Sequence, residues 1–122
     1  MSTPDFQHIS LSMVKDVALV EVLTKDLQGP KIAQELGAEL SQVTAQEWAK
    51  RLLVDFRRTK FLSSTGFAVL FKLASRAAAE GRQVKLCNMD PDVRIGADIV
   101  GLDKVVEIHE SQDSALRAFS QV

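Results

Sequence analysis

The strongest constraint on the fold is an alternation of short apolar runs with segments of helical periodicity, extending from Leu52 to Phe119. Three of the apolar runs have the length of strands, at residues 52–56, 84–87 and 105–108. Each run is followed by a segment whose apolar residues recur at helical spacing. Successive strand–helix–strand units connect parallel strands through right-handed crossovers. The alternation therefore predicts an α/β fold with a mostly parallel sheet.

The N-terminal third of the chain adds two strands and one helix. Residues 6–11 and the β-branched run Val17–Leu23 lie close together, which predicts an antiparallel hairpin. Pro30 suits the first turn of a helix that we expect to end near Val43. The predicted sheet is therefore mixed, with an N-terminal β-hairpin and about four packing helices in all.

The other helix ends are marked by residues that favour helix starts and stops. A second helix is predicted to begin after Ser64 and to end at Gly81. Pro91 opens a third helix, which Gly101 ends, and Ser111 caps the last helix.

Composition narrows the classes of function. The net charge of −1 gives no global field that would attract nucleic acid, and no apolar run is long enough to span a bilayer. Cys87 is the single cysteine, so neither an intrachain disulfide nor a cysteine zinc site is expected. The N-terminus lacks signal-peptide features, which favours a cytoplasmic protein. We expect one domain over residues 1–122, with residues 1–5 as a flexible N-terminus and no metal or cofactor.

A cluster of three hydroxyl side chains, Ser63–Ser64–Thr65, precedes Gly66 where the second helix begins. The first N–H groups of a helix lack partners within it, and the macrodipole makes this end partly positive. A Ser or Thr there commonly caps the helix. The same position also tolerates an anion, including a phosphate carried by one of the hydroxyls. Both roles stay open at this point.

Catalytic signatures are absent from the sequence. It contains no Gly-rich phosphate loop, and no Gly-x-Ser-x-Gly motif surrounds Ser64. His8 and His109 have no metal-ligand partner at useful spacing, so we interpret them as strand-end residues. A hydrolase that uses Ser64 as its nucleophile is a remaining alternative without a visible base. We therefore predict no catalytic residue and no enzyme activity.

Further features favour structural roles. Trp48 is expected to pack over an edge of the core, and Cys87 to be an inert buried thiol. Asp55 is expected at the carboxyl edge of the sheet, where α/β folds place their sites. Residues 57–60 carry three cations, which more often form a solvated loop than a site for an acidic partner.

Three segments together resemble the STAS domain found in bacterial anti-sigma-factor antagonists. The first is Val54–Phe56 with the turn Phe61–Gly66 that follows it. The second is Gly81 followed by the strand Val84–Asn88. The third is Pro91-x-Val93 with the later run Ile99-Val100-Gly101-Leu102. The resemblance covers most of the chain and is strongest from Leu52 to Phe119.

The resemblance implies a mixed sheet with helices packed on it and a function without catalysis. In the antagonists, a partner that is both serine kinase and anti-sigma factor phosphorylates the serine that matches Ser64. The unphosphorylated antagonist binds this partner and frees sigma, the phosphorylated form does not, and a phosphatase resets the switch. Added negative charge at a packed contact surface accounts for the release.

This chain departs from the family pattern at several positions. Ser63 stands where the family motif has Asp, which removes a carboxylate beside the acceptor. Asp26 is the nearest match to the Asp of an early family segment. Gly96 and Ala97 occupy third-helix positions that are usually bulky and apolar in the family. Since that helix helps to dock the kinase, the partner of this chain is expected to differ.

Our first hypothesis is a regulator that binds an anti-sigma factor with serine kinase activity, with Ser64 as the favoured phosphoacceptor before Thr65 and Ser63. The expected contact residues lie on the turn, the second helix and the third helix: Ser63, Ser64, Thr65, Gly66, Lys72, Arg76, Asp92 and Arg94. The alternative is a STAS module that is not phosphorylated and acts as a structural subunit of a larger regulatory or transporter complex. The missing motif Asp favours this alternative.

Overall fold

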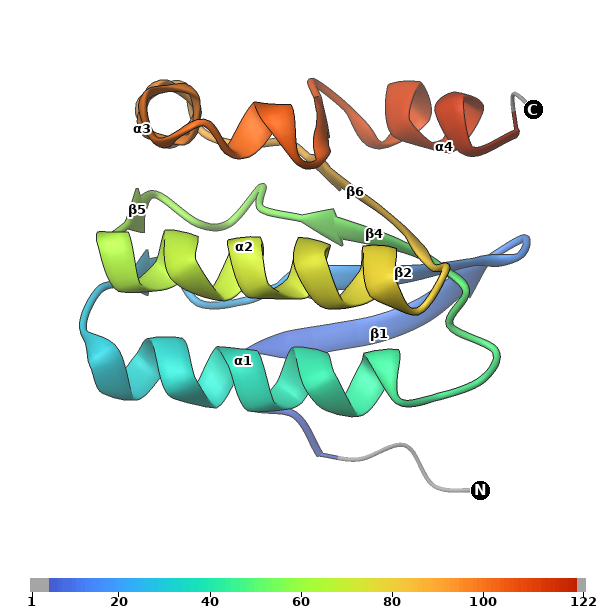
Figure 1. Cartoon of the computed structure of the whole chain (residues 1–122). Coiled ribbons are helices and arrows are strands. Elements are labelled where there is room, and N and C mark those ends of the chain that lie inside the picture. Colours follow the sequence, from blue (N-terminus) through green and yellow to red (C-terminus); the bar gives the residue numbers. More distant parts are fainter. Residues whose placement is uncertain (1–4, 121–122) are drawn as a thin grey trace.

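The computed structural model describes residues 5–120 and contains a five-stranded mixed sheet with helices on both faces (Figure 1). The strand pair at one edge of this sheet, β1 and β2, is antiparallel, and every other neighbouring pair in the sheet is parallel. In spatial order the strands are β1 (Ile9–Val14), β2 (Val17–Val22), β4 (Arg51–Asp55), β6 (Gln83–Cys87) and β7 (Glu107–His109). The predicted mixed, mostly parallel sheet with an N-terminal hairpin is confirmed.

Four α-helices pack against the sheet, as the sequence predicts. They are α1 (Pro30–Thr44), α2 (Ser64–Ala79), α3 (Pro91–Val100) and α4 (Gln112–Ser120). Helices α1 and α2 lie side by side along one face (Figure 1). Helix α4 contacts the central strands from the other face.

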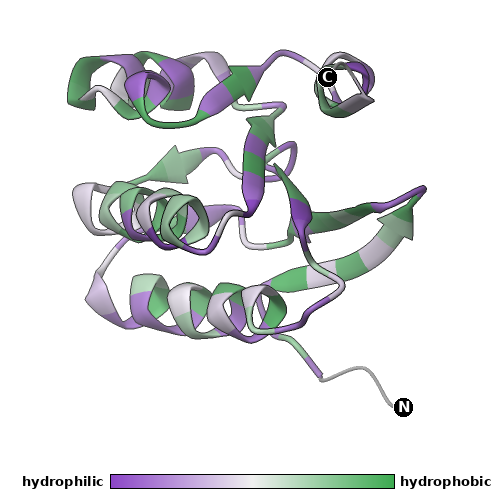
Figure 2. Ribbon diagram, turned by 45° about the vertical axis from the view of Figure 1, so that its right-hand side comes forward, coloured by the Kyte–Doolittle hydropathy of each residue, from purple (hydrophilic) through white to green (hydrophobic). Residues whose placement is uncertain are grey.

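The central strands β2, β4 and β6 are largely buried on both faces, and their alternate side chains enter two separate cores. Leu52, Val54 and Leu86 point into the larger core beneath α1 and α2. Leu53 and Cys87 point the other way, into a smaller core that includes Ala115 and Phe119 of α4. Figure 2 shows green apolar segments in the strands between the helices, interrupted by purple polar residues. Nearly continuous apolar strands are what a parallel sheet covered on both faces requires.

Cys87 is fully buried, as predicted. Burial, together with the nearby Asp55 carboxylate, raises the pKa of its thiol to about 12. The thiol is therefore protonated at neutral pH and behaves as a small core residue.

The predicted ends of α3 and α4 are confirmed in atomic detail. The Asp90 side chain accepts a hydrogen bond from Asp92 N at 3.1 Å, and Pro91 occupies the first turn of α3. Gly101 ends α3 in the left-handed conformation, with φ of 80°. At α4, Ser111 Oγ accepts a hydrogen bond from Ser114 N at 3.1 Å.

A second, two-stranded parallel sheet was not predicted. It joins β3 (Asp26–Leu27) to β5 (Phe61–Leu62), and Ser63 N extends it by donating to Leu27 O at 3.1 Å. Strands of two residues are too short for hydrophobic alternation to indicate them. This small sheet anchors the segment directly before α2.

Two strands differ from the prediction by more than one residue at an end. Strand β1 begins at Ile9 rather than Phe6 and continues to Val14. Strand β7 begins at Glu107 rather than Val105, because a 3₁₀ turn, η1 (Leu102–Lys104), precedes it. The N–H groups of Val105 and Val106 both donate to Leu102 O, so neither is free to join the sheet.

The prediction that Trp48 packs over the core edge is wrong. Trp48 is 43% exposed, and the neighbouring Ala49 takes the buried position instead. The sequence predicts a flexible N-terminus over residues 1–5. Residues 1–4 of this segment lie outside the described residues. Across residues 5–120, no helix combines the length and apolar content needed to cross a bilayer.

Candidate functional site

The hydroxyl cluster lies where β5 leads into the first turn of α2. Ser63 occupies the N-cap position, but its hydroxyl makes no capping hydrogen bond to the helix. Instead, Ser63 Oγ donates to Leu27 O at 3.2 Å and lies 2.8 Å from Thr65 Oγ1. The side-chain cap expected from residue type is therefore replaced by a tie between α2 and β3.

Ser64 differs from both of its neighbours. It is exposed, and its hydroxyl has no hydrogen-bond partner within residues 5–120. The first turn of α2 contains no acidic residue, so the positive end of the helix dipole is not offset there. Ser64 is thus the accessible hydroxyl of the cluster, at a position that tolerates an anion.

Gly66 sets how closely α2 approaches the small sheet. A methyl group at this position would overlap Leu62 Cδ1 and would lie 3.1 Å from Leu62 Cγ and 3.4 Å from Leu27 O. Gly66 is itself buried. Its role in the structure is close packing, which holds the turn that presents Ser64.

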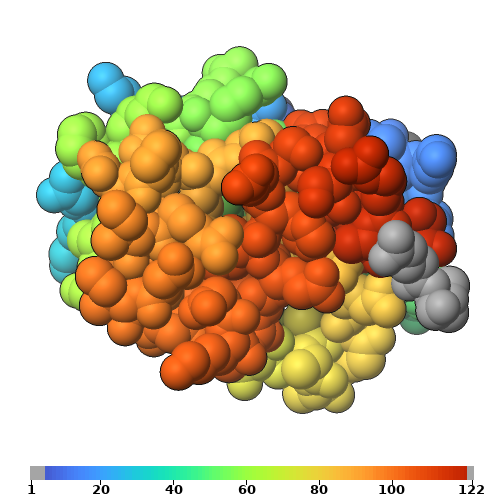
Figure 3. All heavy atoms as spheres, turned by 90° about the horizontal axis from the view of Figure 1, so that it is seen from above, coloured from blue at the N-terminus to red at the C-terminus, as the bar shows by residue number. Residues whose placement is uncertain are grey.

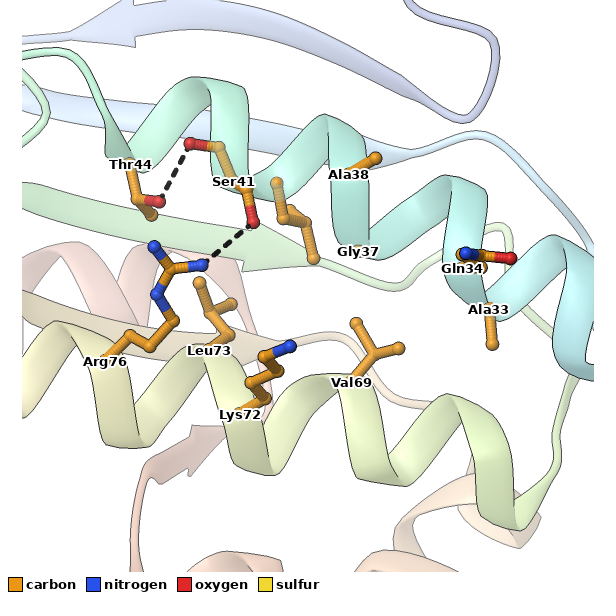
Figure 4. Close-up of a pocket in the computed structure, with 11 residues that line it drawn as sticks. Ala33, Gln34, Gly37, Ala38, Ser41, Thr44, Val69, Lys72, Leu73 and Arg76 are labelled. Atoms are coloured by element: carbon orange, nitrogen blue, oxygen red, sulfur yellow. Dashed lines mark hydrogen bonds between the residues drawn. The ribbon is translucent and has the colours of Figure 1, made fainter.

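Lys72 and Arg76 face α1 rather than Ser64. Both line a groove of about 310 Å³ between α1 and α2, where Arg76 Nη1 donates to Ser41 Oγ at 3.4 Å (Figure 4). Figure 4 shows Arg76 extending from α2 to Ser41 of α1, whereas Lys72 stays close to α2 at the same groove. The structure thus separates these two predicted contact residues from the hydroxyl cluster, although all lie on one helix.

Helix α3 approaches the first turns of α2 through Gly96. A methyl group on Gly96 would lie 3.2 Å from the ring of Phe67, so the two helices touch here. Figure 3 shows the orange surface of α3 beside the green surface that precedes α2. The ring of Phe67 occupies the space beside Gly96 in this chain.

The two predicted contact residues of α3 differ in their surroundings. Asp92 is exposed in the first turn of the helix. Arg94 Nε pairs with Asp98 at 3.0 Å, and Arg94 Nη1 donates to Ile108 O at 3.3 Å. Arg94 therefore helps to attach α3 to β7, and Asp92 is the freer of the two side chains.

The most exposed apolar residues of α3 were missed as site residues. Ile95 and Ile99 are 58% and 79% exposed and lie one turn apart, whereas Val93 and Ala97 face the core. Their spacing contains the signal, because Ile95 and Ile99 cannot share a helix face with Val93 and Ala97.

The cations of residues 57–60 are paired with neighbouring carboxylates. Arg57 and Arg58 both contact Glu21 at 3.1 Å, and Lys60 contacts Asp90 at 3.5 Å. The arginine and lysine side chains are about half exposed or more. This geometry agrees with the interpretation of a solvated loop.

Asp55 is fully buried at the carboxyl end of β4. It accepts hydrogen bonds from Arg57 N at 2.8 Å, Asn88 Nδ2 at 3.1 Å and Gln112 Nε2 at 2.6 Å. The carboxylate therefore joins β4, the end of β6 and α4, and it is closed to a ligand.

The histidines are also engaged in local contacts. His8 lies 2.6 Å from Thr24 Oγ1 and 3.1 Å from Glu35 Oε1, and His109 lies 3.0 Å from both Ser114 Oγ and Glu107 Oε1. No group of three metal-binding side chains occurs in the part of the chain that the structure describes.

Residues 20–115 match the family model of the STAS domain, and the chain therefore belongs to this family. It is similar to BtrV of Bordetella bronchiseptica, a candidate anti-sigma factor antagonist, with 31% identity over 88 residues. This match covers 71% of the present chain and 74% of BtrV. The sequence resemblance is confirmed.

Solved structures agree with this placement. An anti-sigma factor antagonist from Mycobacterium paratuberculosis superimposes with a TM-score of 0.78 at 23% identity, covering 97% of both chains. SpoIIAA from Bacillus, in its phosphorylated form, gives a TM-score of 0.67 at 17% identity, covering 91% of this chain and 98% of SpoIIAA. The chain has the fold of the anti-sigma-factor antagonists.

Proposed function

We propose that the chain is a regulatory binding domain that engages an anti-sigma factor with serine kinase activity and is released when Ser64 is phosphorylated. The observation that carries the proposal is the difference among the three hydroxyls. Ser63 and Thr65 contact each other, whereas the exposed Ser64 hydroxyl has no partner within residues 5–120. A kinase needs an accessible hydroxyl, and Ser64 supplies one.

The surroundings of Ser64 support a switch by charge. A phosphate would add about two negative charges at the N-terminus of α2, where the free N–H groups and the dipole favour an anion. The fold can therefore tolerate the modification. A partner surface packed over the same turn would have to desolvate that charge, which disfavours the complex.

The proposed docking face combines this turn with α3. Ile95 and Ile99 provide the exposed apolar anchors, and the contact of Gly96 with Phe67 places α3 against the start of α2. Asp92 adds a charged side chain to the same helix. Buried apolar anchors dominate most protein interfaces, so we place the binding energy mainly on the two isoleucines. Lys72, Arg76 and Arg94 become secondary contacts.

The switch is tested by affinity purification from the native cells with wild-type, Ser64→Ala and Ser64→Asp baits. Ser64→Ala should retain the partner, and Ser64→Asp should lose it by at least about tenfold, because a charge enters the packed contact. Ser75→Asp is the matched control, since Ser75 is an exposed serine three turns further along α2. Capture that is equal for Ser64→Asp and Ser75→Asp would contradict the switch.

Mass spectrometry of the protein recovered from the same cells provides the second test. We expect a phosphate on Ser64 that is missing in Ser64→Ala. Phosphate found on Thr65 or Ser63 alone would reassign the acceptor.

The alternative is a constitutive STAS module in a larger regulatory or transporter complex. Ser63 favours it, because a hydroxyl that bonds to Leu27 O replaces the carboxylate of the family motif. This alternative predicts no phosphate under growth, stress or stationary conditions, and partner capture that does not respond to ATP.

A further inference from the structure

Within residues 5–120, strand β1 forms one edge of the main sheet without the usual protection of such edges. Native sheets block their edges with charges, Pro, bulges or very short strands, because unpaired backbone groups recruit other strands. The opposite edge strand, β7, has three residues and includes Glu107 and His109. By contrast, β1 has six residues, Ile-Ser-Leu-Ser-Met-Val, with no charge, no Pro and an uninterrupted register with β2.

The hairpin register shows which backbone groups of β1 are open. Leu23 N donates to His8 O at 2.7 Å, so the pair of residues 8 and 23 is hydrogen-bonded. Hydrogen-bonded pairs alternate along an antiparallel ladder, which directs residues 8, 10, 12 and 14 toward β2. The N–H and C=O groups of Ile9, Leu11 and Met13 therefore point out of the sheet edge.

The side chains of these three residues share the face of the larger core. Ile9 is buried, Leu11 is partly buried against the core, and Met13 is 49% exposed. The apolar surface of the larger core therefore continues to the edge of the sheet. It ends there at Met13, whose side chain is left about half exposed by the described residues. A neighbouring strand with the same apolar spacing would complete this surface.

We infer that β1 pairs with β1 of a second copy of this chain, in antiparallel orientation, to form one continuous sheet across a two-fold axis. Leu11 would face Leu11 of the second copy, and Ile9 would face its Met13. This register aligns all outward-pointing residues and allows about six hydrogen bonds, two for each of three facing pairs. It also places apolar side chains opposite apolar side chains, with no like charges across the pair.

A second copy fits this edge for a specific reason. The outward-pointing residues of β1 are spaced symmetrically about Leu11. An antiparallel copy of the same strand therefore presents matching donors and acceptors, and such self-complementarity is what an isologous interface requires. The interface rests mainly on strand pairing, so we expect a reversible dimer that depends on concentration. The inference uses only β1 and is independent of the proposed function.

The test is sedimentation velocity of the full chain from about 1 μM to about 1 mM, for wild type and two variants. Wild type should dimerise within this range, and Met13→Lys should weaken dimerisation by at least about tenfold, because lysine at a sheet edge blocks pairing. Val105→Lys is the matched control: it also places lysine at an exposed apolar residue, here 56% exposed, beside the opposite edge. It should dimerise like wild type.

Amide hydrogen exchange of the wild type distinguishes this dimer from any other. Exchange at Ile9, Leu11 and Met13 should slow as the concentration rises, whereas Ser10 and Ser12, which already donate to β2, should change little. A chain that stays monomeric to 1 mM would overturn the inference. A dimer that Met13→Lys leaves intact, or one without the alternating protection, would overturn it equally.

Discussion

At the scale of single residues, two glycines within helices show that local packing determines whether an added methyl group would stabilise or destabilise the protein. A Cβ on Gly37 of α1 would lie 3.6 Å from Val69, an ordinary contact. A Cβ on Gly66 of α2 would overlap the Leu62 side chain and approach Leu27 O. Both positions lie inside helices, where alanine is intrinsically favoured over glycine.

The two Gly→Ala variants should therefore shift stability in opposite directions. Gly37→Ala should raise the free energy of unfolding by about 0.5–1 kcal/mol through helix propensity. Gly66→Ala should lower it by about 1 kcal/mol, because overpacking costs about 1–3 kcal/mol and propensity offsets only part of it. Urea unfolding of both variants measures the difference. Equal stabilisation by both would show that Leu62 moves aside without cost.

The hydroxyl cluster shows what residue types alone could and could not predict. Ser63, Ser64 and Thr65 were recognised as a site because small polar residues followed a buried strand. Which hydroxyl is free depends on Leu27 O, an acceptor 36 positions before Ser63 in the chain. A contact of that sequence separation belongs to the tertiary structure, and no local pattern indicates it.

At the scale of elements, Asp55 connects a strand, the end of a second strand and a helix. Its carboxylate is fully buried and accepts the side-chain amides of Asn88 and Gln112. The sequence predicted its place at the strand end, but not these partners. Asn88 adopts a positive φ of 59°, so the backbone turns there to bring its amide to Asp55.

Removing this acceptor should loosen the attachment of α4. Asp55→Ala leaves two partly buried amides without their acceptor, and we expect a loss of about 2–4 kcal/mol in the free energy of unfolding. Asp55→Asn retains the shape and one acceptor oxygen, so its loss should be smaller. Asp103→Ala, at an exposed aspartate, is the control and should change stability by less than about 0.5 kcal/mol. Thermal or urea unfolding compares the three, and equal losses for Asp55→Ala and Asp103→Ala would contradict this role.

Helix α3 shows why element type was easier to predict than element orientation. Pro91 and Gly101 marked its ends correctly. The orientation of its apolar residues was not predicted, because a ten-residue helix has few turns in which a periodic pattern can repeat. Ile95 and Ile99, which are exposed and anchor the proposed docking face, were therefore not among the predicted contact residues.

At the scale of the whole molecule, the parallel direction of the strands followed from the alternation of strands and helices, but the small sheet did not. The crossover rule yields a parallel sheet from the periodic segments alone. The pairing of β3 with β5 adds only two residues per strand, yet it fixes where α2 begins. Short non-local pairings of this kind leave no periodic trace in the sequence.

The proposed docking face and the β1 edge are carried by different elements. Helix α2 contacts β5 and β6, and α3 contacts β5, whereas β1 pairs with β2 alone in the described sheet. A dimer through β1 would therefore leave both copies of the docking face open, and it would present two of them together. Such a pair could bind a two-site partner more strongly than a single copy does.

This separation predicts that substitutions on the two surfaces act independently. Ser64→Asp should leave the dissociation constant of the dimer unchanged. At concentrations where the wild type is monomeric, Met13→Lys should capture as much partner for each docking face as the wild type does. The double variant should then show both defects with additive free energies, as expected for distant sites without shared contacts. Sedimentation and capture measured on all four proteins provide the comparison. Loss of the same captured partner in Met13→Lys at low concentration would instead assign partner binding to the β1 edge, because that strand would then contact the partner directly.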